Sequence, residues 1–105
     1  MNKIRAIVKR PNELIGHELS INNALKTFQN IVGGYIEVVP IDGSGAVMIC
    51  NEEGKLLGLP VNFQMPNDII VGTVIVVGTS GAEFTDCPLT LDDWAGVLNE
   101  WGDAI

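Results

Sequence analysis

The sequence predicts an α+β fold with a mostly antiparallel sheet of four to five strands and two helices. Two patterns carry this prediction: short apolar runs separated by glycine-rich turns, and two stretches whose apolar residues recur with the period of a helix. In chain order the elements are β-α-β-β-(β)-β-α, and 105 residues is the length of a single domain, residues 1–105. Because each helix carries one apolar stripe, we expect both helices to pack on the sheet.

The first elements are a strand and a helix. Residues 3–9, with the sequence KIRAIVK, alternate apolar and basic side chains, which is typical of a half-buried strand. In residues 21–32 the apolar side chains recur at helical spacing, so this segment is predicted to be a helix. Ser20 is its expected N-cap, and Gly33 with Gly34 suits the left-handed turn on which helices often end.

The middle of the chain is rich in strand-forming residues. Residues 35–41 and 46–50 are separated by the turn sequence DGSG and are predicted to form a hairpin. The sequence KLLGL at residues 55–59 is predicted as a short third strand, and residues 58–67, which contain two prolines, are expected to be irregular. The almost wholly apolar residues 69–77 predict a central strand that is covered on both faces.

The last element is a predicted helix over residues 91–101. Thr90 and Asp93 have the spacing of a capping box, with Asp in place of the usual Glu, and Leu89 with Trp94 has the spacing of a hydrophobic staple. The apolar stripe of this helix consists of Leu91, Trp94, Val97, Leu98 and Trp101. We expect this stripe and that of the first helix to face one sheet, with Trp94 in the core.

The charge is distributed unevenly along the chain. Thirteen Asp and Glu residues against six Lys and Arg residues give a net charge of −7. Four of the six bases lie within the first ten residues, so the rest of the chain carries −11; these bases are Lys3, Arg5, Lys9 and Arg10. An acidic surface repels the nucleic-acid backbone, so no direct nucleic-acid partner is expected. It is compatible with a small anionic or nucleotide-like ligand held locally, with a basic partner protein, or with acids that only keep the protein soluble.

Other features bear on metals, compartment and assembly. The two cysteines form no CxxC motif, and one histidine cannot complete a metal cluster with them, so we expect no metal, no cofactor and reduced thiols. The longest apolar stretch, residues 69–78, is too short to span a bilayer, and the amino terminus lacks a signal-peptide pattern, so a cytoplasmic protein without a membrane partner is expected. With 47% hydrophobic and only 18% charged residues, we also expect a homo-oligomer.

The candidate ligand-binding site lies in residues 51–67, with one cation from the first strand. Its amides and aromatic ring are Asn51, Asn62, Phe63 and Gln64. Amides that donate and accept beside an aromatic ring suit a nucleobase-like group, with Phe63 stacking and Asn62 reading the edge. Arg5 is the candidate for a phosphate, because a guanidinium can hold phosphate bidentately. In the alternative interpretation the side-chain amides form hydrogen bonds with backbone groups, and Arg5 forms ion pairs with acids of the carboxy-terminal half.

No catalytic residue is predicted. His17 is the only histidine and is expected on a loop, while Glu52 and Glu53 are adjacent in a turn, where their carboxylates diverge. The chain contains no P-loop, no GxGxxG and no GxSxG motif. A small hydrolase that uses these residues is therefore the least favoured function.

Two motifs carry a resemblance to a known family. The sequences VGGYIEVVP at 32–40 and NEEGKLLGLPVN at 51–62 occur in this order, and the similarity extends over roughly residues 3–78. The chain resembles small proteins, labelled only as a domain of unknown function, of bacteriophages, plasmids and firmicute-type bacteria. The resemblance implies a mobile-element setting in the host cytoplasm, in which such proteins are often accessory factors, including inhibitors of host defence. We therefore expect a phage-type accessory protein that sequesters a small nucleotide-derived signal; the alternative is an acidic inhibitor that mimics nucleic acid toward a basic host protein.

Overall fold

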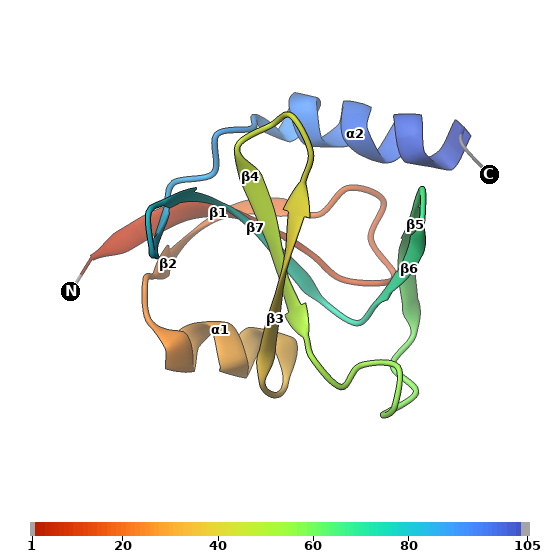
Figure 1. The fold of residues 1–105 in the computed structure, drawn as a ribbon, viewed down its shortest axis with the longest axis horizontal. Helices are drawn as coiled ribbons and strands as arrows, with labels where there is room; N and C mark the ends of the chain where they lie inside the picture. Colours follow the sequence, from red (N-terminus) through yellow and green to blue (C-terminus); the bar gives the residue numbers. More distant parts are fainter. Residues whose placement is uncertain (1, 104–105) are drawn as a thin grey trace.

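The computed structural model describes residues 2–103 and contains eight strands and two helices. They are β1 (Lys3–Lys9), β2 (His17–Asn22), α1 (Leu25–Val32), β3 (Ile36–Ile41), β4 (Ala46–Asn51), β5 (Val61–Met65), β6 (Asp68–Val71), β7 (Val74–Ser80), β8 (Glu83–Thr85) and α2 (Leu91–Asp103). Six strands form one antiparallel sheet in the order β2-β1-β7-β4-β3, with β8 paired to β7, while β5 and β6 form a separate hairpin (Figure 1). The predicted α+β class is confirmed, with more strands than the four to five expected.

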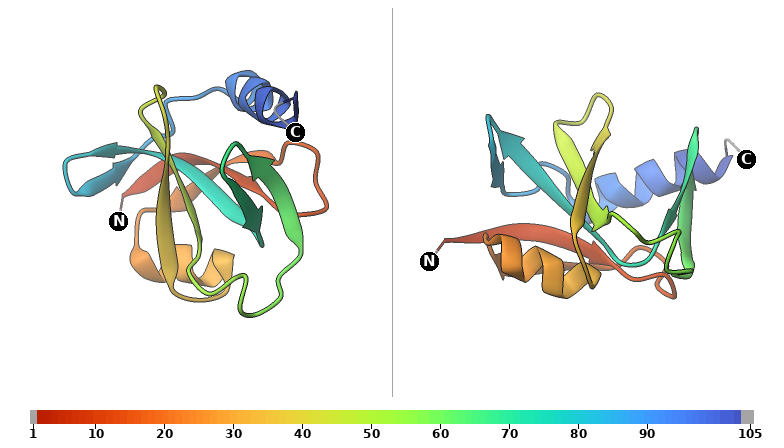
Figure 2. Two further views of the ribbon diagram at one scale, coloured as in Figure 1. Left: turned by 45° about the vertical axis from the view of Figure 1, so that its right-hand side comes forward. Right: turned by 60° about the horizontal axis from the view of Figure 1, so that its bottom comes forward.

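The sheet buries apolar side chains on both of its faces. One face carries the cluster that includes Ala6, Val8 and Ile75 together with Phe28 of α1. The other carries Ile7, Met48 and Val76, and it is covered by Trp94 of α2 and by the β5–β6 hairpin. Both helices therefore pack on the sheet, one on each side of it, as the turned views show (Figure 2). No helix in residues 2–103 is long and apolar enough to cross a membrane.

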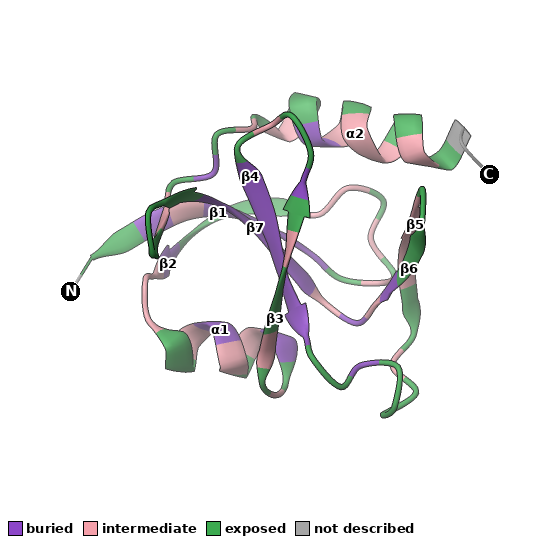
Figure 3. Cartoon of the chain, viewed as in Figure 1, coloured by how far each residue is buried: buried purple, intermediate pink, exposed green. Residues whose placement is uncertain are grey.

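The first strand is covered on both faces, so the prediction of a half-buried strand is wrong. Ile7 has no exposed surface, and even Lys9 is only 3% exposed. The cover on the second face comes from segments far away in the sequence, α2 and the β5–β6 hairpin, which alternation within the strand does not reveal. The buried strands β1, β4 and β7 cross the middle of the molecule (Figure 3).

The first helix begins later than predicted. Residues 17–22 pair with β1 in a continuous antiparallel register, so Ser20 lies in a strand and does not cap the helix. The helix follows the extended residue Ala24, whose side chain makes no capping bond. The apolar stripe was nevertheless a correct guide to burial, because Ile21 packs in the same cluster as Phe28. Pairing with a neighbouring strand here outweighs the local helical period.

The predicted strand over residues 69–77 is interrupted at Gly72. β6 ends at Val71 and β7 begins at Val74, so the apolar run contributes to two different sheets. Gly72 has a φ of +74°, and a Cβ at this position would lie 2.8 Å from the Cδ1 atom of Leu59, so only glycine fits the turn. β7 is the predicted central strand, since it lies between β1 and β4 and is covered on both faces.

The segment between β4 and β6 differs most from the prediction. Residues 52–58 form consecutive turns in place of the third strand expected from KLLGL. The backbone groups of this segment bond to one another, as in the 2.9 Å hydrogen bond from Leu57 N to Glu53 O. They therefore do not require a partner strand. Residues 58–67, expected to be irregular, contain β5, because β6 supplies an antiparallel partner.

The predicted end of α1, the capping box of α2 and the first hairpin turn are confirmed. α1 ends at Gly33, which has a φ of +83° and donates its N–H to Gln29 O at 2.8 Å. β3 and β4 form a hairpin around the DGSG turn. At α2 the Thr90 N–H donates to Asp93 Oδ2 and the Asp93 N–H donates to Thr90 Oγ1, both at 3.0 Å, which is a capping box with Asp in the usual place of Glu.

Replacing Trp94 with alanine should lower the free energy of unfolding by about 3–5 kcal/mol, because it removes a fully buried ring and the indole hydrogen bond to Ile15 O. Urea unfolding followed by circular dichroism measures the loss. Leu56→Ala, at a residue that is 87% exposed, is the control and should change little. Equal midpoints for the two variants would contradict the placement of Trp94 in the core.

Candidate functional site

A groove opens between the segment that follows β1, strand β5 and helix α2. It encloses about 690 Å³, which is within the ~300–1,000 Å³ typical of small-molecule sites. Its apolar lining is Leu14, Ile15, Phe63, Ala95 and Leu98, with Gly102 at one end, and its polar lining is Lys9, Glu13, Asn62, Gln64 and Asn99. This β5–α2 groove brings together three of the five predicted binding residues: Asn62, Phe63 and Gln64.

Lys9 is the cation of the groove. Its ammonium donates to Asn62 Oδ1 at 2.5 Å and to Arg10 O at 3.5 Å, and it lies over the ring of Phe63, 5.7 Å from the centroid. Burial lowers the pKa of Lys9 below its usual value, and the nearby negative charge of Glu13 partly opposes that shift. Two ion pairs of Arg or Lys with a carboxylate and one contact between His17 and Glu13 are found within residues 2–103, and Lys9 belongs to none of them.

Asn62 positions Lys9, and its side-chain amide forms its hydrogen bonds within the protein. Its Nδ2 atom donates to Lys9 O at 2.9 Å and to Gly72 O at 2.8 Å, while its Oδ1 atom accepts from the Lys9 ammonium. Both amide hydrogens and the oxygen are therefore engaged within the protein. Gln64 also lines the groove, and its side chain makes no hydrogen bond within the described residues.

Phe63 belongs to an aromatic cluster that holds α2 against the hairpin. Its ring stacks on Trp101 with centroids 5.7 Å apart, and it meets Trp94 edge to face at 5.6 Å. A stacking partner is thus already present inside the protein. Phe63 consequently forms part of the apolar wall of the groove, and one face of its ring is already occupied by Trp101.

Glu13 also lines the groove, and both of its carboxylate oxygens have partners within the protein. One carboxylate oxygen accepts the Arg10 N–H at 2.8 Å, and the other lies 3.0 Å from His17 Nε2. The Arg10 N–H bond is the main cause of the lowered pKa of Glu13. The next residues are tied to α2, because the Trp94 indole donates to Ile15 O at 3.0 Å. Leu14, between these anchors, is 90% exposed at the mouth of the groove.

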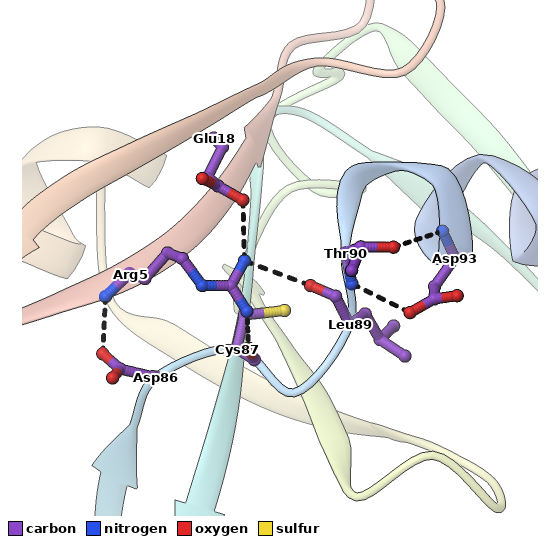
Figure 4. A network of polar contacts seen from close by, with 7 residues as sticks. All are labelled: Arg5, Glu18, Asp86, Cys87, Leu89, Thr90 and Asp93. Atoms are coloured by element: carbon purple, nitrogen blue, oxygen red, sulfur yellow. Dashed lines mark hydrogen bonds and ion pairs between the residues drawn. The ribbon is translucent and has the colours of Figure 1, made fainter.

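Arg5 lies in a different polar network, shown in Figure 4. Its Nη1 atom donates to Glu18 Oε1 at 2.8 Å and to Leu89 O at 3.2 Å, and its Nη2 atom donates to Cys87 O. The backbone of Arg5 also forms hydrogen bonds with this connection: Arg5 N donates to Asp86 Oδ1 and Cys87 N donates to Arg5 O, each at 2.8 Å. Arg5 therefore fastens the connection between β8 and α2 to β1. Its carboxylate partner comes from β2, and the carboxy-terminal half supplies carbonyl oxygens to the side chain.

Asn51 also has a role in holding the chain together. It is 6% exposed, donates from Nδ2 to Val32 O at 3.2 Å, and accepts the Glu53 N–H at 2.8 Å through Oδ1. A Cβ on Gly34 would lie 2.9 Å from its Nδ2 atom, so the glycine leaves room for this amide. The bonds of Asn51 link the end of α1 to the turn after β4, away from the β5–α2 groove.

The residues considered as catalytic candidates lie in two different parts of the chain, on β2 and in the turns after β4. His17 is the first residue of β2, not a loop residue, and it pairs with Glu13. Glu52 and Glu53 are exposed in the turns after β4. Within the described residues no group of three His, Cys, Asp or Glu side chains could hold a metal ion, and both Cys50 and Cys87 are free and buried.

Sequence reasoning missed Lys9, Glu13 and the contribution of α2 to the groove. Lys9 was placed on the exposed face of a half-buried strand, and the acidic and apolar residues that follow Pro11 were assigned to no element. The available signal is Ile15 in a segment bounded by Pro11 and Gly16, since burial of an apolar side chain against the rest of the fold is favourable.

The chain belongs to the family described as Domain of unknown function (DUF3846). The family model matches residues 4–99, which includes both motifs and most of α2. The expected resemblance to a domain of unknown function is thereby confirmed, and it extends beyond residues 3–78. Comparison with curated proteins and with solved structures finds no match. The function of this DUF3846 domain therefore has to be argued from the groove itself.

Replacing Arg5 with lysine should lower the free energy of unfolding by about 1–3 kcal/mol, because a lysine cannot reproduce the forked bonds to the Cys87 and Leu89 carbonyls. Chemical denaturation measures the change. Arg10→Lys is the matched control, since Arg10 is exposed. If both variants unfold at the same denaturant concentration as the parent, Arg5 has no such fastening role.

Proposed function

We propose that this protein is a non-enzymatic binding protein that holds a small anionic, nucleotide-derived molecule in the β5–α2 groove. In the mobile-element setting that the sequence resemblance implies, such binding would sequester a signal of host defence. One observation carries the proposal: Lys9 is a buried cation at the wall of a ligand-sized groove, without a carboxylate within 4.0 Å in the described residues.

The bonding of Lys9 supports an anionic ligand. An ammonium has three N–H groups, and two of them are directed to Asn62 Oδ1 and Arg10 O. Removing a charge from water is costly unless an opposite charge compensates it. A ligand anion that accepts the third N–H would supply both the missing charge and the missing bond.

The rest of the lining supports a ligand with a flat, partly apolar body. Phe63, Leu98 and Ile15 offer apolar contact, while the amides of Gln64 and Asn99 offer donors and acceptors at the rim. A nucleotide combines these needs, since its base is planar with a polar edge and its phosphate is charged.

The alternative function, an acidic inhibitor of a basic host protein, is supported by the surface charge. Five acidic residues from β8 onward are exposed, namely Glu83, Asp86, Asp92, Asp93 and Glu100, and no Lys or Arg follows Lys55 in the sequence. Binding through such a surface weakens steeply with added salt, whereas binding in a partly buried groove changes less. A salt titration of the isolated interaction therefore separates the two functions.

We also propose that the protein is a homo-oligomer. Large apolar side chains remain exposed on the single chain, among them Tyr35, Leu56, Leu57 and Val61. Contact between copies would remove this surface from water. Sedimentation at micromolar concentration tests the assembly, and a single species of 11.3 kDa would contradict it.

The test of the binding function uses Lys9→Met, which keeps the length of the side chain and removes its charge. With 3′,5′-cyclic AMP as the probe, calorimetry should show binding to the parent protein and a loss of tenfold or more in the variant. The control is Lys26→Met, at an exposed position on α1. Native mass spectrometry of freshly purified protein adds an independent search for a retained ligand. Unchanged affinity in Lys9→Met, or no nucleotide binding by the parent, would overturn the proposal.

Binding should also depend on pH in a defined direction. The phosphodiester stays ionised, but the Lys9 ammonium loses its proton at a lower pH than an ordinary lysine, because burial lowers its pKa and Glu13 only partly restores it. Affinity should therefore be full below this pKa and fall as pH rises through it. The stability of the free protein should show the opposite trend and rise with pH between the lowered pKa of Lys9 and the usual value of 10.5. In this pH range Lys9 is protonated in the unfolded chain but has lost its proton in the folded protein, so raising the pH favours folding. Affinity independent of pH up to 10.5 would contradict the role of Lys9.

A further inference from the structure

The β5–α2 groove carries two opposite charges that are not paired with each other. Lys9 and Glu13 both line it, and they are close enough for the carboxylate to influence the pKa of the ammonium. They form no ion pair within 4.0 Å in the described structure. Because both charges line the same groove, a ligand that carries a negative group and a hydrogen-bond donor can contact both of them.

Neither charge is free to move to the other. Asn62 and Arg10 O hold the ammonium, while Arg10 N and His17 hold the two carboxylate oxygens. A carboxylate has about four lone-pair sites, so two acceptor sites of Glu13 remain after these two contacts. The carboxylate can thus accept a donor from a ligand without giving up its own anchors.

From this geometry we infer that the groove selects a ligand that bears one negative charge for Lys9 and a neutral N–H donor, such as the exocyclic amino group of a nucleobase, for Glu13. The inference rests on the proposed function and specifies its ligand class. The single positive charge of Lys9 matches a monoanion such as a phosphodiester. A phosphomonoester carries close to two negative charges at neutral pH, and Glu13 repels the additional charge.

The apolar lining fits between these two polar ends. Phe63 and Leu98 come from β5 and α2 and contact the body of the ligand, and Leu14 stands at the mouth. A base with its amino edge toward Glu13 and its phosphodiester toward Lys9 places its ring over this surface. Gln64 and Asn99 then remain for the other polar atoms of the base or sugar.

Three probes separate these requirements in calorimetry at pH 8. The first is 3′,5′-cyclic AMP, a monoanion with an amino group; the second is the 3′,5′-cyclic monophosphate of purine riboside, which lacks only the amino group; the third is 5′-AMP, a phosphomonoester. The parent protein should bind the first at least tenfold more tightly than either of the others.

Glu13→Gln provides the decisive variant, because glutamine can keep the bond to Arg10 N while removing the charge. In this variant the three affinities should fall within about threefold of one another. Glu83→Gln, an exposed acid on β8, is the control and should keep the tenfold preferences. Thermal unfolding of both variants checks that the fold is retained, and Asn99→Ala, at an exposed groove position, should weaken all three probes without changing their order.

The outcomes distinguish this inference from the proposed function. Binding that depends on Lys9 but shows equal affinities for the first two probes, or preferences unchanged in Glu13→Gln, overturns the inference and leaves the binding function standing. Failure of the parent to bind any of the three probes overturns both. A tenfold preference that disappears only in Glu13→Gln establishes the selection.

Discussion

The side chain of Asn62 connects the parts of the molecule that form the groove. Its amide joins the backbone of β1 to the turn at Gly72, and its oxygen holds the Lys9 ammonium. The two bonds to Lys9 fix the β5–β6 hairpin, which lies outside the main sheet, over β1, and the bond to Gly72 ties Asn62 to the turn after β6. The cover of the second sheet face and the burial of Lys9 depend on that attachment together with the packing of Phe63 on Trp94 and Trp101, so Asn62 matters to the site without having to touch a ligand.

The cations Arg5 and Lys9 of β1 have different hydrogen-bond partners. Arg5 and Lys9 both project from β1 toward the side of the sheet that α2 covers, but they meet different segments of the chain. Near Arg5 the connection before α2 presents carbonyl oxygens, and the planar guanidinium bonds to two of them. Near Lys9 the chain presents an amide, an aromatic ring and empty volume, so part of the hydrogen-bonding capacity of the ammonium stays available.

The parts of the fold that could be predicted are those in which neighbouring residues decide the outcome. The capping box of Thr90 and Asp93, the turn at DGSG and the end of α1 at Gly33 all rest on local bonds, and all three are correct. The predictions are wrong where contact with a segment distant in the sequence determines the structure. Ser20 reads as a helix cap but pairs with β1, Gly72 interrupts an apolar run in order to pass Leu59, and Lys9 is buried by residues more than fifty positions away. The same reason explains the site: Asn62, Phe63 and Gln64 were found by composition, whereas the choice between Arg5 and Lys9 depended on which segments cover β1.

The aromatic cluster gives the molecule an internal reporter. The chain has two tryptophans, and both belong to the cluster: Trp94 is bonded to the loop that carries the mouth of the groove, and Trp101 stacks on a ring in its wall. All of the tryptophan emission therefore originates in the aromatic cluster behind the wall of the groove. Occupation of the groove, movement of the loop and detachment of α2 each alter the surroundings of at least one indole. Emission excited selectively from tryptophan consequently reads the state of this one region without a label.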